Sequence, residues 1–396
     1  MEENRNVPKL RFPGFDSEWE QRKVQDIYKI TRGYVLAAPE TDEVSSDEKP
    51  YPVYSSQTKN NGLMGYYRDY LYEDAITWTT DGANAGTVNY RPGKFYCTNV
   101  CGVLLSDEGY SNKCAAEALN SIAWKWVSHV GNPKLMNNVM GEIPITLPKS
   151  IEEQNQISKF FEQIDNLITL HQQKLEGIKE YKKGMLQKMF PKEEEKIPEI
   201  RFPGFSGDWE QRKLSDCAGF RRGSFPQPYG NREWYDGEGA MPFVQVADVA
   251  DDMKLVDVTK QKISKVAQPM SVFADEGSVL VTLQGSIGRV AITQYGAFVD
   301  RTVLIFDKYN LDIDKTFWAY IIKGKFIDEA KRAPGGTIKT ITKEALSDFD
   351  LMLPSYDEQK KLGAFLANID NLITLHQRKI DELKELKKGL LQQMFV

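Results

Sequence analysis

Two stretches of the chain carry the hydrophobic spacing of a long amphipathic helix. Apolar residues recur at alternating intervals of four and three along 164–190, and the same register returns along 369–395. Such a seam predicts two helical rods that each pack against a helical partner. The seam positions are Ile164, Ile168, His171, Leu175, Ile178, Met185 and Met189 in the first stretch and Ile369, Ile373, His376, Ile380, Leu383, Leu390 and Met394 in the second. Lys182 and Lys387 stand where one more apolar residue is expected.

These two helices are the last parts of a larger internal repeat. Residues 11–23 (RFPGFDSEWEQRK) match residues 201–213 (RFPGFSGDWEQRK) at ten of thirteen positions, and 164–190 match 369–395 at nineteen of twenty-seven. A Leu-Pro pair followed by Glu-Gln also recurs before each helix. Each repeat is therefore an arm, a globular stretch, a Leu-Pro stop and a long helix. A pseudo-twofold between the repeats predicts that the two helices pair antiparallel, as an intramolecular coiled coil.

The globular stretches inside the repeats scarcely align with each other. Both contain short β-rich runs separated by Gly, Asn and Asp turns, such as 75–78 and 278–283, and a helical pattern such as 315–333. We therefore expect an α+β fold with two strand-rich heads. The expected boundaries are an arm at 1–23, head one at 24–146, a spacer helix at 147–190, a linker and second arm at 191–213, head two at 214–352 and a second spacer helix at 353–396.

Composition narrows the class of protein further. Hydrophobic residues make up 41% and charged residues 27% of the 396 residues, which is typical of a soluble globular protein. The first residues lack the layout of a signal peptide, and no apolar run approaches the ~18–20 residues needed to cross a bilayer. Four cysteines without an export signal predict reduced thiols in the cytoplasm. The net charge of −5 argues against binding to nucleic acid. Net charge describes the whole chain, however, and says little about a local binding surface.

No reaction centre is recognisable in the sequence. Phosphate loops, dinucleotide fingerprints, the nucleophile elbow and the zinc-protease helix motif are all absent. No Pro-Pro pair occurs, as an adenine methyltransferase would require. Cys97 and Cys101 lack the second ligand pair of a zinc site, so we expect no metal.

The heads instead carry polar, aromatic and basic side chains in glycine-rich loops. Residues 78–87 in head one read WTTDGANAGT, and head two contains TLQGSIGR at 282–289 and GGTIKT at 335–340. Glycine allows the backbone to approach phosphates, and Asn, Gln and Arg can pair with base edges. The alternative is that these loops are ordinary turns between strands.

The chain resembles a known family over almost its whole length. Its paired RFPGF…WEQRK arms, its Leu-Pro…Glu-Gln stops and its IDNLITLHQ helices resemble the frame of the specificity subunits of type I restriction–modification systems. Residues 76–87 look like one variety of that family's target-recognition domain. Residues 280–291, together with Asp300-Arg301 and 335–337, look like another.

The resemblance implies a non-catalytic subunit that recognises a split, asymmetric DNA site. Each head would read one half of the site, and the two helices would set the gap between the halves. Two modification subunits, which use S-adenosylmethionine, would dock on the frame, and restriction subunits that use ATP and Mg²⁺ would join outside them. The chain itself would hold no cofactor. The expected DNA-binding residues are Arg32, Thr80, Asn84, Thr87, Tyr90, Arg91, Lys94, Arg222, Gln284, Ser286, Arg289, Arg301, Lys339 and Thr340. The expected subunit interface includes Lys174, Lys183, Lys188, Lys379 and Lys388.

Two other classes of function compete with this interpretation. A coiled-coil scaffold that joins two protein-binding heads would share the same frame. A self-sufficient nuclease or methyltransferase would need motifs that the chain does not contain. A gel shift with the methyltransferase partner on duplex DNA separates the scaffold from the DNA reader, and an activity assay of the isolated chain tests the enzyme.

Overall fold

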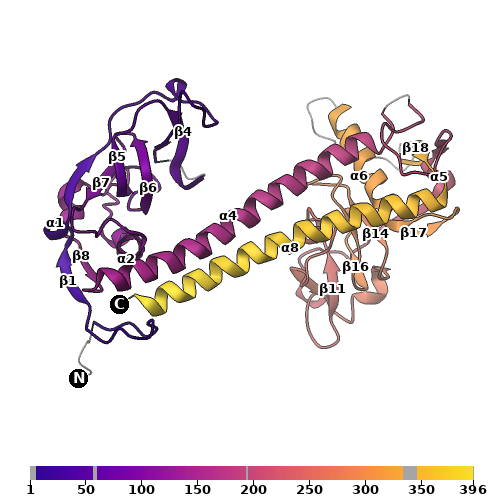
Figure 1. The fold of residues 1–396 in the computed structure, drawn as a ribbon. Helices are drawn as coiled ribbons and strands as arrows, with labels where there is room; N and C mark the ends of the chain where they lie inside the picture. Colours follow the sequence, from indigo (N-terminus) through magenta and orange to yellow (C-terminus); the bar gives the residue numbers. More distant parts are fainter. Residues whose placement is uncertain (1–5, 57–59, 193–194, 333–345, 396) are drawn as a thin grey trace. The chain divides into compact units, whose positions relative to one another are not determined.

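The chain folds into two compact units that each contain one head. The computed structural model describes residues 6–56, 60–192, 195–332 and 346–395. Unit 1 comprises Met1–Gln172 and Arg378–Val396, and unit 2 comprises Gln173–Gln377. Each long helix therefore contributes one part to each unit (Figure 1). Helices and strands are mixed in both units, which confirms the predicted α+β class.

The two long helices are α4 (Ile151–Lys188) and α8 (Tyr356–Met394), and they pair antiparallel. In unit 1, the ring centre of Phe161 in the first part of α4 lies 6.0 Å from the ring centre of Phe395, the residue directly after α8. In unit 2, the ring centre of Tyr181 near the end of α4 lies 6.4 Å from the ring centre of Phe365 in the first part of α8. The predicted coiled-coil seam is confirmed at its most buried positions, which are Ile164, Ile168, Leu175, Met189, Ile369, Ile380, Leu383 and Met394.

A serine begins each long helix. The backbone amide of Glu153 donates to Oγ of Ser150, and the amide of Glu358 donates to Oγ of Ser355, both at 3.4 Å. These are N-cap bonds, which satisfy an amide that has no partner inside the helix. The helices therefore start about one turn after the Leu-Pro stops, well before the repeated IDNLITLHQ segments.

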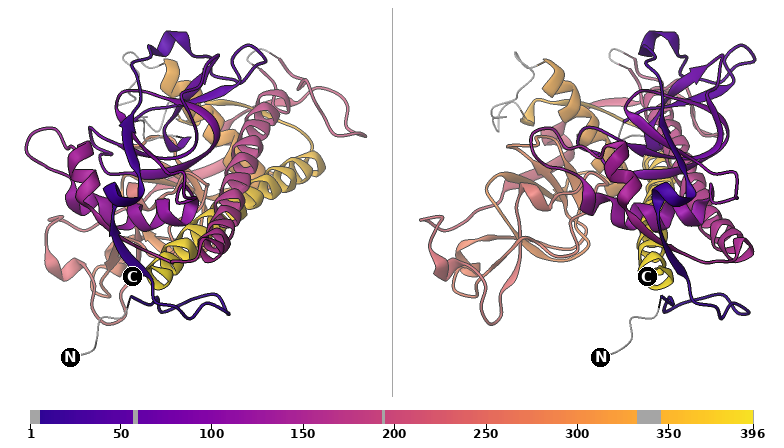
Figure 2. Two further views of the ribbon diagram at one scale, coloured as in Figure 1. Left: turned by 60° about the vertical axis from the view of Figure 1, so that its left-hand side comes forward. Right: turned by 90° about the vertical axis from the view of Figure 1, so that its left-hand side faces the viewer.

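The arms close onto these helix starts through paired Arg–Glu contacts. Arg11 makes a two-pronged contact with Glu153 at 2.6 and 2.8 Å, and Arg201 does the same with Glu358 at 2.7 Å for both bonds. The Glu153 side chain is fully buried and also accepts a bond from Nε1 of Trp19. In unit 1 the arm also lies beside the end of α8 (Figure 2), because the amide of Leu10 donates to Gln393. In each repeat the arginine of the RFPGF segment therefore holds the glutamate of the Glu-Gln segment, and we call each of these two Arg–Glu contacts a clamp.

Head one is built on a six-stranded sheet in the order β2-β7-β5-β6-β3-β4. Its strands are β2 (Lys29–Arg32), β3 (Tyr51–Tyr54), β4 (Leu63–Tyr67), β5 (Tyr72–Thr79), β6 (Val88–Cys97) and β7 (Cys101–Leu105). A separate pair joins β1 (Glu20–Lys23) to β8 (Pro144–Leu147). Short helix α1 (Val24–Ile27), helix α2 (Lys113–Ala123) and helix α3 (Asn137–Glu142) belong to the same head.

Head two contains two four-stranded sheets, β10-β17-β14-β15 and β12-β11-β16-β13. The strands are β10 (Ala218–Arg222), β11 (Met241–Val244), β12 (Gln261–Ile263), β13 (Val272–Ala274), β14 (Val279–Thr282), β15 (Val290–Ile292), β16 (Ala297–Val299) and β17 (Val303–Tyr309). Strand β9 (Glu210–Lys213) pairs with β18 (Asp350–Leu353). Helices α5 (Leu214–Cys217) and α6 (Lys315–Arg332) belong to the same head.

The two heads share a strand plan although their sequences scarcely align. In head one β7 lies between β2 and β5, and in head two β17 lies between β10 and β14, antiparallel in every case. Both heads also contain one parallel pair, β3 with β6 and β11 with β16. The shared features are backbone pairings, which many different side chains can support, and this is why sequence comparison does not reveal them.

Candidate nucleic-acid interface

The parallel pair of each head ends at a cluster of chain segments. In head one, Tyr54 of β3 is opposite Cys97 of β6, and the next amide, that of Thr98, donates to the carbonyl of Tyr54 at 2.9 Å. In head two, the amide of Asp300 donates to the carbonyl of Val244 at the same distance. Both strands of a parallel pair end at the same edge, so the segments that follow them come together there.

The Arg-Gly pair of each head, Arg32-Gly33 and Arg222-Gly223, lies in this cluster. The backbone there passes so close to the neighbouring strand that only glycine fits. A Cβ atom on Gly33 would lie 2.1 Å from the carbonyl oxygen of Cys97, and one on Gly223 would lie 2.2 Å from that of Val299. No side chain fits at such distances. The Arg-Gly pair that the two heads share in sequence therefore marks the place where the chain crosses the end of the parallel pair. Arg32 and Arg222, the residues before these glycines, are exposed.

The glycine-rich loop of head one, residues 79–87, is closed by its own backbone. We call it loop one. The amide of Thr79 donates to the carbonyl of Thr87 at 3.0 Å, and the amide of Gly86 donates to the carbonyl of Thr79 at 2.9 Å. The amide of Thr80 donates to the carbonyl of Val100 at 2.9 Å, which ties the loop to the segment after β6.

Loop two, residues 282–289 of head two, has three equivalent backbone hydrogen bonds. The amide of Thr282 donates to the carbonyl of Arg289 at 2.9 Å, and the amide of Gly288 donates back to Thr282 at 3.0 Å. The amide of Leu283 donates to Thr302 at 2.8 Å, as Thr80 does to Val100. The two loops therefore occupy the same place in the two heads while presenting different side chains.

The structure places the predicted residues of loop one at different depths. Thr87 is exposed, whereas Thr80 is buried and bonded to Asp81. Asn84 is half-buried, and its amide donates to the carbonyl of Ser56 at 3.1 Å, so it holds the segment that follows β3.

Three further candidates lie on β6, and the structure commits one of them to the interior. Arg91 is buried: its guanidinium lies 3.7 Å from the ring centre of Tyr54 and donates to the carbonyl of Asn61 at 2.7 Å. Burial lowers the pKa of Arg91. Tyr90 is half-buried, and burial together with Asp74 raises its pKa to about 12. Lys94 is exposed, with its ammonium 4.6 Å from the ring centre of Tyr70.

In head two the candidates gather at the tip of loop two and beside it. Gln284 and Ser286 are exposed. Arg289 pairs with Asp251 at 3.0 Å, and exposed Arg301 lies over the ring of Tyr229. Lys339 and Thr340 lie outside the described residues.

Sequence reasoning missed the segments against which the loops pack. Loop one contacts Ser56 after β3, and loop two contacts residues 249–251 after β11 through Arg289. Loop one also packs against residues 127–135. Periodicity gives no signal for these segments because they are neither strands nor helices over most of their length.

The described residues contain no group of three or more His, Cys, Asp or Glu side chains that could hold a metal ion. Cys97, Cys101, Cys114 and Cys217 are buried free thiols, and burial raises the pKa of each. Within the same residues, no helix is both long and apolar enough to span a membrane.

Comparison with known proteins decides the family. The model of the type I restriction modification DNA specificity domain matches the chain twice, at residues 16–180 and 206–385. The chain belongs to this family. It is 43% identical over 136 residues, 33% of this chain and 71% of the relative, to the N-terminal part of a putative type I specificity subunit from Mycoplasma pneumoniae. Over 98% of its length it is 22% identical to a putative type I restriction enzyme specificity subunit from Methanocaldococcus jannaschii, of which 95% is covered.

The fold of the specificity subunit agrees with a solved structure of the same family. The S subunit of a type I restriction-modification system from M. genitalium matches with a TM-score of 0.70. Sequence identity is 14%, and the match covers 98% of this chain and 99% of the other. The two-headed fold is thus retained at an identity where side chains have largely changed.

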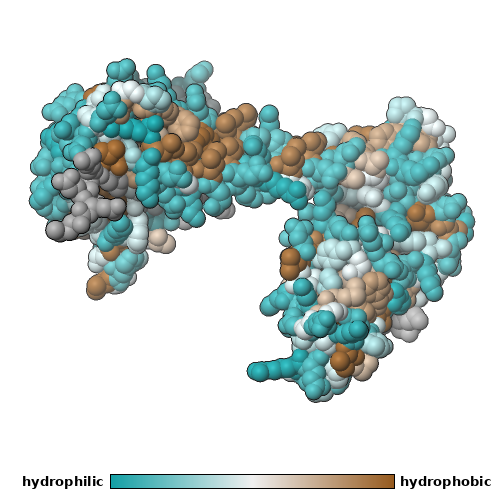
Figure 3. Space-filling model, turned by 90° about the horizontal axis from the view of Figure 1, so that it is seen from below, coloured by the Kyte–Doolittle hydropathy of each residue, from teal (hydrophilic) through white to brown (hydrophobic). Residues whose placement is uncertain are grey.

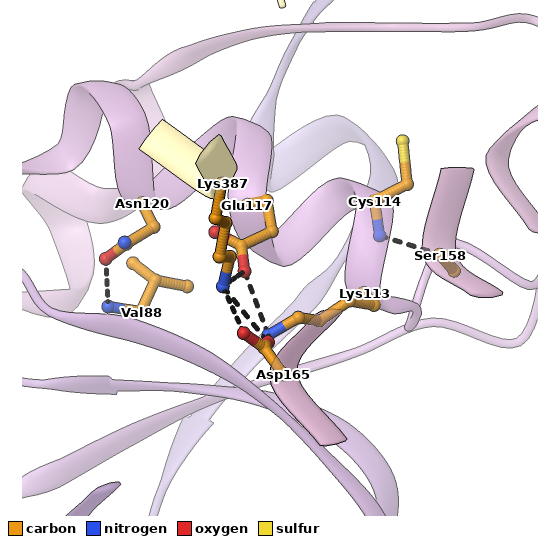
Figure 4. A network of polar contacts seen from close by, with 8 residues as sticks. All are labelled: Val88, Lys113, Cys114, Glu117, Asn120, Ser158, Asp165 and Lys387. Carbon is orange, nitrogen blue, oxygen red and sulfur yellow. Dashed lines mark hydrogen bonds and ion pairs between the residues drawn. The ribbon is translucent and has the colours of Figure 1, made fainter. Parts of the chain in front are cut away.

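The frame of the specificity subunit is tied to head one by a network of charges (Figure 4). Lys387 of α8 contacts Asp165 of α4 at 2.8 Å and Glu117 of α2 at 2.7 Å, and Lys113 of α2 contacts Asp165 at 2.7 Å. Burial alone would raise the pKa of Asp165, but Lys113 and Lys387 outweigh it and hold that pKa below its usual value. In unit 2, Lys182 of α4 pairs with Asp370 of α8, which also accepts from Tyr320.

These contacts explain the two lysines that interrupt the hydrophobic seam. Lys182 and Lys387 are the same position in the two repeats, and each contacts the aspartate at the second position of the IDNLITLHQ segment in the opposite helix. A partly buried ionic pair at one seam position favours one register of a coiled coil over others. The two pairs therefore fix the antiparallel register within each unit.

The lysines predicted for the subunit interface lie exposed on the frame helices. They are Lys174, Lys183, Lys188, Lys379 and Lys388. Lys188, Lys379 and Lys388 have acidic neighbours within 4 Å, at Glu199, Glu382 and Glu385 respectively.

Leucines are exposed on the same helices, at Leu167 and Leu170 in unit 1 and at Leu372 and Leu375 in unit 2. Apolar side chains accordingly interrupt the hydrophilic surface along the helices (Figure 3). Each leucine of unit 1 has its counterpart 205 positions later in unit 2, the same offset as between the two helical repeats.

Proposed function

We propose that this specificity subunit reads a split, asymmetric DNA site, with one half read by each head. The observation that carries this proposal is the equivalence of the two loops. Three equivalent backbone hydrogen bonds hold both loops, but loop one exposes Thr87, whereas loop two exposes Gln284 and Ser286. Equal placement with different side chains suits two heads that meet DNA in the same way and select different bases.

Two modification subunits would dock on the frame, one for each repeat. The exposed leucines support this proposal, because Leu167 and Leu170 recur as Leu372 and Leu375 and so offer two equivalent apolar patches. The exposed lysines around them would add charged contacts at the rim of each interface. S-adenosylmethionine would be held by these partners, and ATP and Mg²⁺ by restriction subunits outside them. The chain would supply recognition and no catalytic group.

Methylation mapping of the complex with its modification subunits tests the assignment of heads to half-sites. Ser286→Ala and Gln284→Ala in loop two should relax the choice of bases in one half-site only, and Thr87→Ala in loop one in the other. A lost base contact of this kind costs about 1–3 kcal/mol. Variants that alter both halves equally, or neither, would exclude the one-head, one-half assignment.

The two long helices would set the number of unread bases between the half-sites. A matched test inserts one heptad into each helix between its aspartate and its lysine, that is, between Asp165 and Lys182 and between Asp370 and Lys387. Both ionic pairs and the seam keep their register. One heptad is ~10 Å of helix, or about three base pairs at ~3.4 Å each. An active variant that methylates sites with the parental spacing would refute this role of the helices.

A further inference from the structure

We propose that a hairpin in head one, residues 128–134, contacts the first half-site beside loop one. This inference rests on the proposed DNA-reading function and assigns it a second element. The hairpin is closed by two hydrogen bonds: the amide of Ser128 donates to the carbonyl of Lys134 at 2.8 Å, and the amide of Lys134 donates back at 3.0 Å. It follows α2 in the chain, and its residues read SHVGNPK.

The base of the hairpin is fixed to loop one by the backbone. The amide of Gly82 in the loop donates to the carbonyl of Pro133 at 3.0 Å, and the amide of Leu135 donates to the carbonyl of Thr80 at 2.9 Å. The buried Nε1 of Trp78 donates to the carbonyl of Leu135 at 3.0 Å. The hairpin and loop one therefore form one rigid element, and a duplex that meets the loop meets the hairpin as well.

A second contact joins the two elements at the other end of the loop. A Cβ atom on Gly86 would come within 2.7 Å of Cγ2 of Val127, so the residue before the hairpin packs closely on the loop. The carboxylate of Asp81 lies 3.6 Å from the ammonium of Lys134. This pair offsets the acidic charge of loop one, which would otherwise repel phosphates.

The tip of the hairpin is open to solvent and carries groups that suit a groove of DNA. His129 and Asn132 are exposed, and both can donate and accept hydrogen bonds as base edges require. Val130 is 92% exposed, and an apolar side chain in that position can contact a thymine methyl group. Gly131, with φ of +75°, makes the turn between them.

The distribution of acidic residues supports the same surface. The chain contains 56 Asp and Glu residues, yet residues 118–141, which include the hairpin, contain none. The other two longest stretches without Asp or Glu are 82–106 and 277–299, and these contain most of loop one and all of loop two. Carboxylates near phosphates repel them, and these three stretches carry no carboxylate side chain.

The test uses the complex of the full chain with its modification subunits. Competition binding compares the intact site with duplexes in which each base pair is changed in turn. Asn132→Ala and His129→Ala should lower affinity for the intact site between about 5-fold and about 150-fold. The same variants should lose preference at base pairs of the first half-site only. Lys134→Ala should weaken binding to all sequences alike, and the slope of log affinity against log salt concentration should fall by about 1.

Val44→Ala, at a position of head one that is 74% exposed, is the matched control and should bind as the parent does. Hairpin variants that keep parental affinity and base preference would overturn the proposal. So would variants that lose modification subunits while keeping their base preference, because the hairpin would then be a protein contact. A parent complex without any sequence preference would instead overturn the proposed DNA-reading function, and this outcome is visible before any variant is made.

Discussion

Replacing Lys387 by methionine gives the sharpest test of the charge network that joins α8 to head one. The change keeps the aliphatic volume at a seam position but removes a cation that contacts Asp165 and Glu117. Lys113 then remains to balance two carboxylates. We therefore expect the variant to be less stable, although methionine is the residue type that the heptad pattern favours.

The magnitude follows from the exposure of the side chains. Breaking a fully buried ion pair costs about 3–5 kcal/mol, and an exposed pair contributes about 0–1 kcal/mol. The side chain of Lys387 is 18% exposed and that of Asp165 is 32% exposed. The network is therefore intermediate, and we expect Lys387→Met to lower the free energy of unfolding by about 2 kcal/mol. With a urea slope of about 2 kcal/mol per molar, the midpoint of unfolding falls by about 1 M.

Urea unfolding followed by far-UV circular dichroism measures this loss, and a double variant tests its cause. Adding Asp165→Asn to Lys387→Met leaves Lys113 paired with Glu117 and restores electrical balance. The double variant should therefore recover at least about 1 kcal/mol relative to the sum of the two single losses. Lys384→Met, at an exposed position of the same helix, is the control and should change stability by less than about 0.5 kcal/mol. Additive losses in the double variant would show that the four charges act separately and do not form a coupled network.

Four further predictions concern the clamp, the crossing glycine, pH and catalysis. Glu153→Ala should destabilise the chain by about 3 kcal/mol in the same urea assay, because it leaves Arg11 without its partner, and Arg11→Ala in that background should cost little more. Gly33→Ala should prevent folding of head one, seen as loss of soluble protein, whereas Gly177→Ala on the open surface of α4 should raise stability by about 1 kcal/mol. Because the pKa of Asp165 is depressed in the folded chain, the ionised carboxylate should contribute fully to the free energy of unfolding above its unfolded pKa of ~3.9. This contribution should be lost as the pH falls below that value, and the Asp165→Asn variant should not show the loss. The purified chain should not turn over S-adenosylmethionine or ATP, and turnover by the pure chain would contradict its assignment as a recognition subunit.

The frame could be predicted from the sequence because its evidence is periodic and repeated. The seam, the antiparallel pairing and the oddity of Lys182 and Lys387 are all visible in residue spacing. Their partners, Asp165 and Asp370, could not be identified in the same way. An ionic contact between two helices depends on their relative register, and a list of apolar positions leaves that register open.

The heads were less predictable, and the reasons are physical. Their common plan consists of backbone hydrogen bonds and one glycine crossing, so dissimilar sequences can form it. Arg91 illustrates the limit of reasoning from residue type. Arginine in a glycine-rich region suggests a contact with DNA, but the ring of Tyr54 and the carbonyl of Asn61 hold this guanidinium inside the head. Which basic residues reach the surface is decided by tertiary packing.

The backbone closure of loops one and two has a consequence for how new specificities arise. A turn that is held by amides and carbonyls keeps its shape whichever side chains it carries, provided that Gly86 and Gly288 keep their positive φ. Exposed positions such as Thr87, Gln284 and Ser286 can therefore change with little loss of stability. These loops are therefore suited to randomised libraries, in which the proposed choice of bases can be selected while the yield of folded protein stays nearly constant.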